Sequence, residues 1–399
     1  MNLQNLILLK KLYEDEIFNP DGEDFQKAAK LVEKAEKLGL SGNIFRAYLI
    51  YFLAHEKNLI SETVEITGGK VGESLREIFR RDIESLLKNF SGEICDPAFD
   101  FLREYIPTEK NKIESLDELD KRLENVSDAG EIADIFIEHY KKFGYGDIAA
   151  CRAFRWDEGK KNIVGIRHFE KISLEDLIGY EHQKELLTKN TIAFLANKPA
   201  NNVLLVGARG TGKSSGVKAL VNEYYSKGLR LVQITKPQLI NLFEIMHTLR
   251  KLPSRHFIIF LDDLSFEEDE PEYKFLKSSI EGGVESKPKN VLIYATSNRR
   301  HLIRETWRDR VDEREELYRN DSVNETISLS DRFGLIIRYD APSQKEYLAI
   351  IRHMLKKNGI ELDEETLRVE SVRWEMTHSG RNGRTAKQFV DNYLGQQNL

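Results

Sequence analysis

The feature that most constrains this chain is the segment 207–214, which reads GARGTGKS. It fits the phosphate-binding pattern G-x-x-x-x-G-K-[ST] at every fixed position. An apolar run at 203–206 precedes it, and apolar residues at helical spacing follow it at 215–227. A strand, a glycine loop and a helix make a phosphate cradle, because the loop amides and the helix N-terminus point at the anion. A turn that binds nothing is the alternative, but it gives the lysine no role.

The pattern assigns a role to each part of this loop. Lys213 would reach the β- and γ-phosphates of a nucleotide, and the hydroxyl of Ser214 would bind Mg²⁺. The loop residues that we expect to hold the phosphates are Gly207, Ala208, Arg209, Gly210, Thr211, Gly212, Lys213, Ser214 and Ser215.

Length and composition limit the class of protein. A chain of 399 residues is too long for one typical core, so two or three domains are expected. No apolar run approaches a bilayer span and the first residues lack a signal-peptide layout, so we expect no membrane association. Cys95 and Cys151 are the two cysteines, and without a CxxC motif they argue against zinc and a disulfide framework. We therefore expect a cytoplasmic protein.

Charge is distributed unevenly along the chain. Residues 1–150 hold 20 Lys and Arg against 30 Asp and Glu, and the rest hold 40 against 36. An acidic front is a poor partner for phosphate backbones, so it suits a protein-binding or regulatory region. A solvated helical surface with no partner is an equally open interpretation.

The periodicity predicts four segments. Residues 1–150 form a helical N-terminal domain, 151–173 a linker or hairpin, 174–341 an α/β core and 342–399 a helical region. A strand pair closing over the core is an alternative for the second segment. The core strands are expected at 203–206, 229–234, 257–261, 291–296 and 335–339, and a short helix is expected near Glu364.

Two acids follow the apolar run 257–261, and the first lies 49 positions after Lys213. A buried parallel strand delivers carboxylates to its C-terminal edge, where ligands bind. Asp262 would hold Mg²⁺, mostly through water, and Asp263 would polarise the attacking water. A capping carboxylate placed there by chance is the alternative.

A polar residue at the tip of the strand 291–296 could also lie beside the γ-phosphate and orient the water. Asn298 is the first candidate for this position, and Thr296 is the second.

These motifs resemble, in their order, those of the AAA+ ATPases. The order is the glycine loop, the acid pair at 262–263, Asn298, the DRF at 331–333 and the GRTA at 383–386. The stretches 200–216, 262–267 and 294–301 look more closely like an uncharacterised bacterial AAA+ group, domain of unknown function family 815. The resemblance runs from about residue 150 to the end.

The resemblance implies an α/β P-loop NTPase core with a five-stranded parallel sheet and a central P-loop strand. It also implies a small helical C-terminal lid, beside a separate all-helical N-terminal domain. ATP and Mg²⁺ would be bound, with the adenine near Ile178 and Gly179. Arg332 would be the arginine finger that a neighbouring subunit inserts, and Arg384 the sensor 2 arginine, with Arg381 as its alternative.

The sequence departs from the family pattern at two places. Most AAA+ members have Asp-Glu where this chain has Asp262-Asp263, so hydrolysis is expected to be slow. Either Asp263 or Glu267 would activate the water. The loop 235–238 lacks the aromatic residue of pore-threading members, which disfavours a peptide-gripping unfoldase.

The leading hypothesis is therefore a Mg²⁺-dependent ATPase that acts as a switch or remodeller on a protein partner. It is expected to form a homo-oligomer, either a ring or an open assembly. The alternatives are an ATPase that loads nucleic acid, which the charge does not favour, and an ATP-binding scaffold with negligible turnover. The charged insertion 304–325 has no assigned role.

Overall fold

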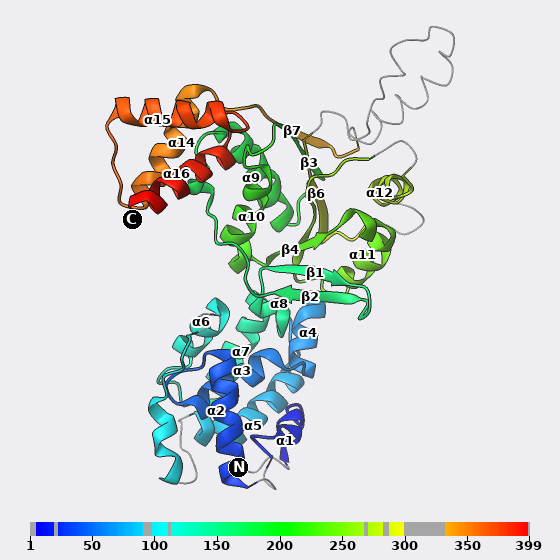
Figure 1. The fold of residues 1–399 in the computed structure, drawn as a ribbon. Helices are drawn as coiled ribbons and strands as arrows, with labels where there is room; N and C mark the ends of the chain where they lie inside the picture. The colour runs from blue at the N-terminus through cyan, green and yellow to red at the C-terminus, as the bar shows by residue number, and fades with distance from the viewer. Residues whose placement is uncertain are drawn as a thin grey trace. The chain divides into compact units, whose positions relative to one another are not determined.

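The computed structural model describes residues 5–19, 23–90, 97–110, 113–266, 270–281, 287–298 and 332–397 (Figure 1). It divides into two compact units. The helical unit comprises Met1–Cys151 and Lys251–Arg255, and the α/β unit comprises Arg152–Arg250 and His256–Leu399. Cys95, Glu267, Asp331 and the insertion 304–325 lie outside the described residues.

The helical unit is built from helices closed by local caps. Asn43, Asn58 and Asp128 each accept a backbone N–H of the first turn of the helix they precede, which satisfies a donor that has no partner within the helix. The elements are α1 (Lys11–Glu14), α2 (Asp24–Leu38), α3 (Ile44–His55), α4 (Leu59–Thr67), α5 (Glu73–Phe90), η2 (Pro97–Glu104), α6 (Glu114–Arg122), α7 (Ala129–Phe143) and α8 (Asp147–Ala150).

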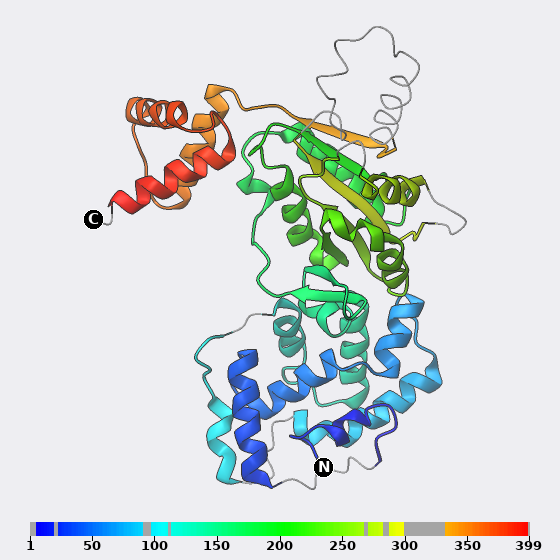
Figure 2. The same cartoon turned by 45° about the vertical axis from the view of Figure 1, so that its right-hand side comes forward.

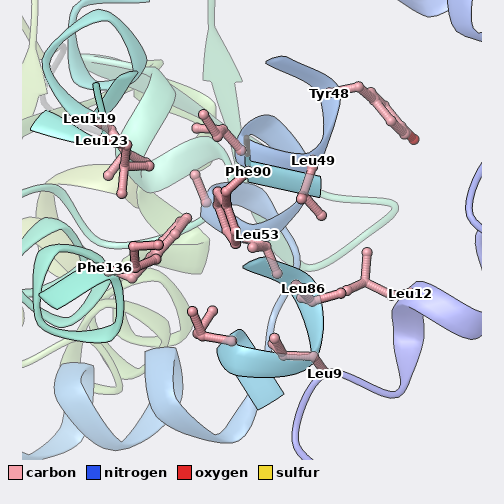
Figure 3. Close-up of a cluster of buried hydrophobic side chains, with 14 of the residues drawn as sticks. Leu9, Leu12, Tyr48, Leu49, Leu53, Leu86, Phe90, Leu119, Leu123 and Phe136 are labelled. Carbon is pink, nitrogen blue, oxygen red and sulfur yellow. The ribbon is translucent and has the colours of Figure 1, made fainter. Parts of the chain in front are cut away.

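One apolar core holds these helices together. Leu53 of α3, Leu86 of α5 and Phe136 of α7 point into it (Figure 3). A buried carboxylate fixes the start of the chain: Asp82 accepts the N–H groups of Ile7 and Leu9 at 3.0 Å, and that of Leu8 at 2.7 Å. A segment without regular hydrogen bonds is thereby attached to the side of α5.

The α/β unit alternates strands with helices. Its elements are β1 (Ala153–Asp157), β2 (Asn162–Ile166), η3 (Leu174–Asp176), α9 (Glu181–Leu195), β3 (Val203–Gly207), α10 (Lys213–Tyr224), η4 (Tyr225–Lys227), β4 (Leu229–Ile234), η5 (Lys236–Asn241), α11 (Leu242–Arg250), β5 (His256–Leu261), α12 (Glu272–Glu281), β6 (Val291–Ser297), β7 (Leu335–Tyr339), α14 (Gln344–Lys357), α15 (Glu364–Thr377) and α16 (Gly383–Gln397).

The sheet corrects the prediction of five parallel strands. It has seven strands in the order β2-β1-β4-β5-β6-β3-β7, and β2 runs antiparallel to β1 while the other pairs are parallel. The segment 151–173, predicted as a linker or hairpin, is an antiparallel hairpin of β1 and β2, but its place as part of the core sheet was not among the five predicted strands. Ala153, Phe154 and Trp156 are buried, and β1 pairs with β4 through Phe154 opposite Val232.

The P-loop strand is not central, contrary to the prediction. β3 lies between β6 and β7, and β7 is an edge strand among the described residues. β1 and β2 extend the sheet beyond β4, at the end away from β3, so the middle strand of the seven is β5.

Helices cover both faces of the sheet (Figures 1 and 2). Alternate residues of each strand, such as Val203 and Leu205, pack against α9 and α10. The helices α11 and α12 lie on the other face. Strands buried on both sides read as continuous apolar runs, which is why the sequence located them well.

Three helices follow the sheet. Tyr347 and Ile351 of α14, Leu367 of α15 and Phe389 of α16 belong to one small core. The short helix expected near Glu364 is a 14-residue helix, because Asp363 caps two of its N–H groups and Leu367 anchors it. None of the described helices is both long enough and apolar enough to cross a membrane.

Candidate active site

The glycine loop joins the C-terminal end of β3 to the start of α10. Gly210 and Gly212 have φ of 75° and 86°, a region that glycine enters at little cost. Gly207 is required for a second reason: a Cβ there would lie 1.9 Å from the carbonyl oxygen of Tyr339 on β7. The loop therefore folds tightly against the neighbouring strand.

Lys213 lies at the base of this loop with 6% of its surface exposed. Its Nζ donates to the carbonyl oxygens of Gly207 at 2.9 Å and Ala208 at 2.7 Å, and to Oδ1 of Asn298 at 3.1 Å. Burial lowers the pKa of Lys213, and the carboxylates of Asp263 and Asp262 oppose that shift. The ammonium group is thus held by acceptors that an anion could replace.

The two acids follow β5 and meet this loop beside Thr296 and Asn298 at the end of β6. Oδ1 of Asp262 accepts from the hydroxyl of Ser214 at 2.5 Å and from that of Thr296 at 2.7 Å. Oδ1 of Asp263 accepts from the side-chain amide of Asn298. Asn298 therefore contacts both Lys213 and Asp263.

The donor set at Ser214 and Asp262 fits Mg²⁺. A hydroxyl and a carboxylate are hard oxygen ligands, and Mg²⁺ takes few ligands from the protein while it keeps water and phosphate oxygens. Among the described residues, no group of three or more His, Cys, Asp or Glu side chains is arranged to hold a metal ion. In the described part of the chain, Mg²⁺ would therefore need water and phosphate oxygens as well as protein ligands.

These groups line a cavity of about 800 Å³ within the α/β unit. The cavity brings together most of the predicted site residues. They are Ile178, Arg209, Gly210, Thr211, Gly212, Lys213, Ser214, Ser215, Asp262, Asp263, Thr296, Asn298 and Arg384. Four others, Gly179, Gly207, Ala208 and Arg332, are not among the lining residues. Arg332 is half-buried and stands just before β7.

The C-terminal helices complete the cavity. The N–H of Gly383, the first residue of α16, donates to the carbonyl oxygen of Gly210 at 2.8 Å. Arg384 follows on the same helix and is exposed to the cavity. Arg381 instead donates to Glu375 at 2.8 Å and does not line the cavity. The geometry therefore favours Arg384 over its alternative.

Apart from Arg384, sequence reasoning missed the cavity residues that α14 and α16 contribute. Ile350 and Met354 of α14 and Val390 of α16 form an apolar wall, and His353 and Asn358 add polar groups. Lys357 bonds Asp176 at 2.5 Å, which holds the pKa of that carboxyl at about 2. No local pattern distinguishes these residues, because only the tertiary placement of the helices turns them toward the loop.

A family model described as "Protein of unknown function (DUF815)" matches residues 149–397. The chain belongs to this family. The match covers the α/β unit almost completely and begins just before β1. It confirms the resemblance to family 815 on which the sequence interpretation drew. No curated protein matches the chain.

Solved structures with a similar fold are distant in sequence. The Holliday junction branch migration motor RuvB of Thermotoga maritima is 15% identical, with a TM-score of 0.32 over 56% of this chain and 72% of that one. The FIGL-1 AAA domain in complex with ADP is 17% identical, with a TM-score of 0.36 over 56% and 72%. The Aeropyrum pernix ORC1 protein in complex with DNA is 13% identical, with a TM-score of 0.41 over 56% and 62%.

Proposed function

We propose that this protein is a Mg²⁺-dependent ATPase of the AAA+ type whose active site is the cavity around the segment 207–214. One observation carries the proposal: side chains from three separate strand ends form one hydrogen-bonded group, in which Thr296 links the Ser214–Asp262 pair to Asp263, Asn298 and Lys213. The glycine loop alone would support nucleotide binding. The acids and the amide beside it supply what hydrolysis needs.

Each side chain would have one task when the nucleotide binds. The amides of the loop and the start of α10 would hold the phosphates, and Lys213 would exchange its carbonyl partners for phosphate oxygens. Mg²⁺, held by Ser214 and Asp262, would neutralise the charge on the phosphate oxygens. The apolar wall of Ile178 and Ile350 suits a nucleobase.

Asp263 would accept the proton of the attacking water, and Asn298 would orient that water. In the described state Asn298 donates to Asp263, so the acid is held close to the phosphate site but occupied. Movement of Lys213 onto a phosphate would remove one partner of Asn298 and allow this amide to turn toward water. We propose that Asp263 performs this step, since the alternative, Glu267, lies outside the described residues.

Two arginines would supply further positive charge at the γ-phosphate. Arg384, at the start of α16, lines the cavity and would approach the γ-phosphate from the C-terminal helices, which act as a lid. Arg332 does not line the cavity of its own chain, which supports a role at the site of a neighbouring copy. An arginine supplied in this way stabilises the transition state by about 10³- to 10⁵-fold in rate.

The charge of the first 150 residues, 20 basic against 30 acidic, supports a protein as the partner and disfavours nucleic acid. The proposed role is therefore that of an ATP-driven switch or remodeller that acts on another protein as a homo-oligomer.

Nucleotide binding is tested by replacing the lysine. Lys213→Ala removes the cation that faces the phosphates, and we expect ATP affinity to be lost while the circular dichroism spectrum is unchanged. Lys189→Ala on α9, an exposed lysine paired with Glu185, is the matched control and should bind ATP normally. Calorimetric titration of ATP into each protein gives the answer, and equal affinity of the two variants would remove the P-loop assignment.

A further inference from the structure

The backbone of Asp263 is left-handed, with φ of 53°. Only four other non-glycine residues in the described ranges have positive φ: Asn125, Lys161, Tyr180 and Asn197. Most side chains avoid this region, and Asn and Asp tolerate it best among residues with a Cβ. Outliers of this kind gather at functional sites, where the surrounding structure must hold them.

Thr296 of β6 holds this conformation. Its Oγ1 accepts the N–H of Asp263 at 2.8 Å and donates to Oδ1 of Asp262 at 2.7 Å. Its carbonyl oxygen accepts the N–H of Leu264 at 2.7 Å. One residue therefore fixes three consecutive positions of the neighbouring strand end.

The chemistry of a hydroxyl suits this position. The side chain at position 296 must accept from an N–H and donate to a carboxylate at the same time, which a hydroxyl can do and a methyl group cannot. Thr296 is 2% exposed, and loss of its hydroxyl would leave the N–H of Asp263, in a partly buried hydrogen bond, without this partner. The one O–H of Thr296 is already donated to Asp262, whereas the side-chain amide of Asn298 has two N–H groups and donates one of them to Asp263, so Asn298 is the better candidate to orient water.

We propose that Thr296 is a positioning residue for hydrolysis: its hydroxyl locks the left-handed turn that aims the carboxylate of Asp263 at Asn298. The inference rests on the proposed ATPase function. It also accounts for the short acid at this position. A left-handed residue favours aspartate over glutamate, so the turn and the Asp263 side chain form one matched solution.

The test removes the hydroxyl and keeps the shape. Thr296→Val should lower kcat by about a hundredfold, the scale of a displacement of about 1 Å. The affinity for ADP without Mg²⁺ should stay within about twofold, because the phosphate loop is untouched. Thr296→Ser keeps the hydroxyl and should recover most of the rate. Thr191→Val, another buried threonine with two hydroxyl contacts in this unit, is the matched control and should leave kcat unchanged.

A second readout does not depend on turnover. Hydrogen exchange at the amides of Asp263 and Leu264 should become faster in Thr296→Val and stay slow in Thr191→Val. Unchanged exchange and unchanged kcat in Thr296→Val would overturn the positioning role, even if the wild-type protein hydrolyses ATP. Faster exchange in a protein that binds no ATP would instead uphold the turn and reject the ATPase.

Asp263→Glu gives an independent arm if Thr296→Val does not fold. The longer acid is the residue that most AAA+ members carry, yet at a left-handed position we expect kcat to fall. A higher kcat than wild type would show that the turn does not select aspartate, and would contradict the proposal.

Discussion

His139 shows how a single buried side chain can set the pH range of the helical unit. It is 3% exposed, and its Nε2 has no hydrogen-bonding partner among the described residues. Burial, reinforced by the positive charges of His55 and Arg255, lowers the pKa of His139 to about 3. The imidazole is therefore neutral in the folded protein throughout the physiological range.

The consequence for stability follows from the sign of this shift. Below about pH 6.5 the unfolded chain binds a proton at this position and the folded chain does not, so stability falls as the pH falls toward 3. At pH 5 the loss from this residue is about 2 kcal/mol. His139→Phe should remove that loss, so the variant gains about 2 kcal/mol relative to wild type between pH 7 and pH 5.

Urea unfolding of both proteins at the two pH values, followed by circular dichroism, measures this difference. His168→Gln, an exposed histidine, serves as the control and should keep the wild-type slope. An unchanged slope in His139→Phe would mean that His139 is already accessible to protons in the folded state.

At the scale of elements, the C-terminal end of α7 depends on an arginine far away in the sequence. Arg255 is buried, and its guanidinium donates to the carbonyl oxygens of Tyr140 at 2.5 Å, Lys141 at 2.8 Å and Lys142 at 2.7 Å. Helix ends leave such carbonyls without partners, and a cation there also complements the helix dipole. The buried Glu65 of α4 lies 3.7 Å from Nε of Arg255.

Loss of this arginine should therefore destabilise the helical unit strongly. Arg255→Ala removes the cation beside the buried Glu65 and a donor from each of three carbonyl oxygens, although Glu65 keeps the N–H of Ser254 and Tyr140 keeps that of Gly144. We expect a loss of about 3–5 kcal/mol in the free energy of unfolding, because a buried carboxylate loses its counter-charge. Lys251→Ala, an exposed neighbour in the same segment, should change it by less than about 0.5 kcal/mol. Denaturant unfolding of both variants measures the effect. A loss below about 1 kcal/mol in Arg255→Ala would show that water replaces the guanidinium.

The elements also show what the sequence could and could not predict. β3, β5 and β6 lie within one residue of their expected bounds, because continuous apolar runs identify buried parallel strands. β4 and β7 have the expected bounds although polar residues interrupt their runs. The hairpin of β1 and β2 lies in the segment where a linker or hairpin was predicted, but its place in the sheet depends on pairing with β4, which no local pattern shows. The same division holds at the cavity: the motifs named Lys213 and the acids, whereas the left-handed turn at Asp263 has no signature in the residue types alone.

At the scale of the whole molecule, we propose that two copies share each active site. Arg332 does not line the cavity of its own chain, while Lys213, Asp263 and Asn298 do. A single copy should therefore bind ATP and hydrolyse it slowly, and specific activity should rise with protein concentration as copies associate. The short acid at Asp263 makes this dependence on a neighbour stronger.

The most direct measurement is phosphate release from a mixture of two inactive variants. Arg332→Ala keeps its phosphate loop and loses the finger, while Lys213→Ala keeps the finger and loses ATP binding. In an equal mixture about a quarter of the interfaces pair an intact loop with an intact finger, provided that contacts run head to tail. We expect recovery of about that fraction of wild-type activity. A mixture that stays inactive would contradict the shared active site, provided that both variants fold and associate and that Arg332→Ala still binds ATP.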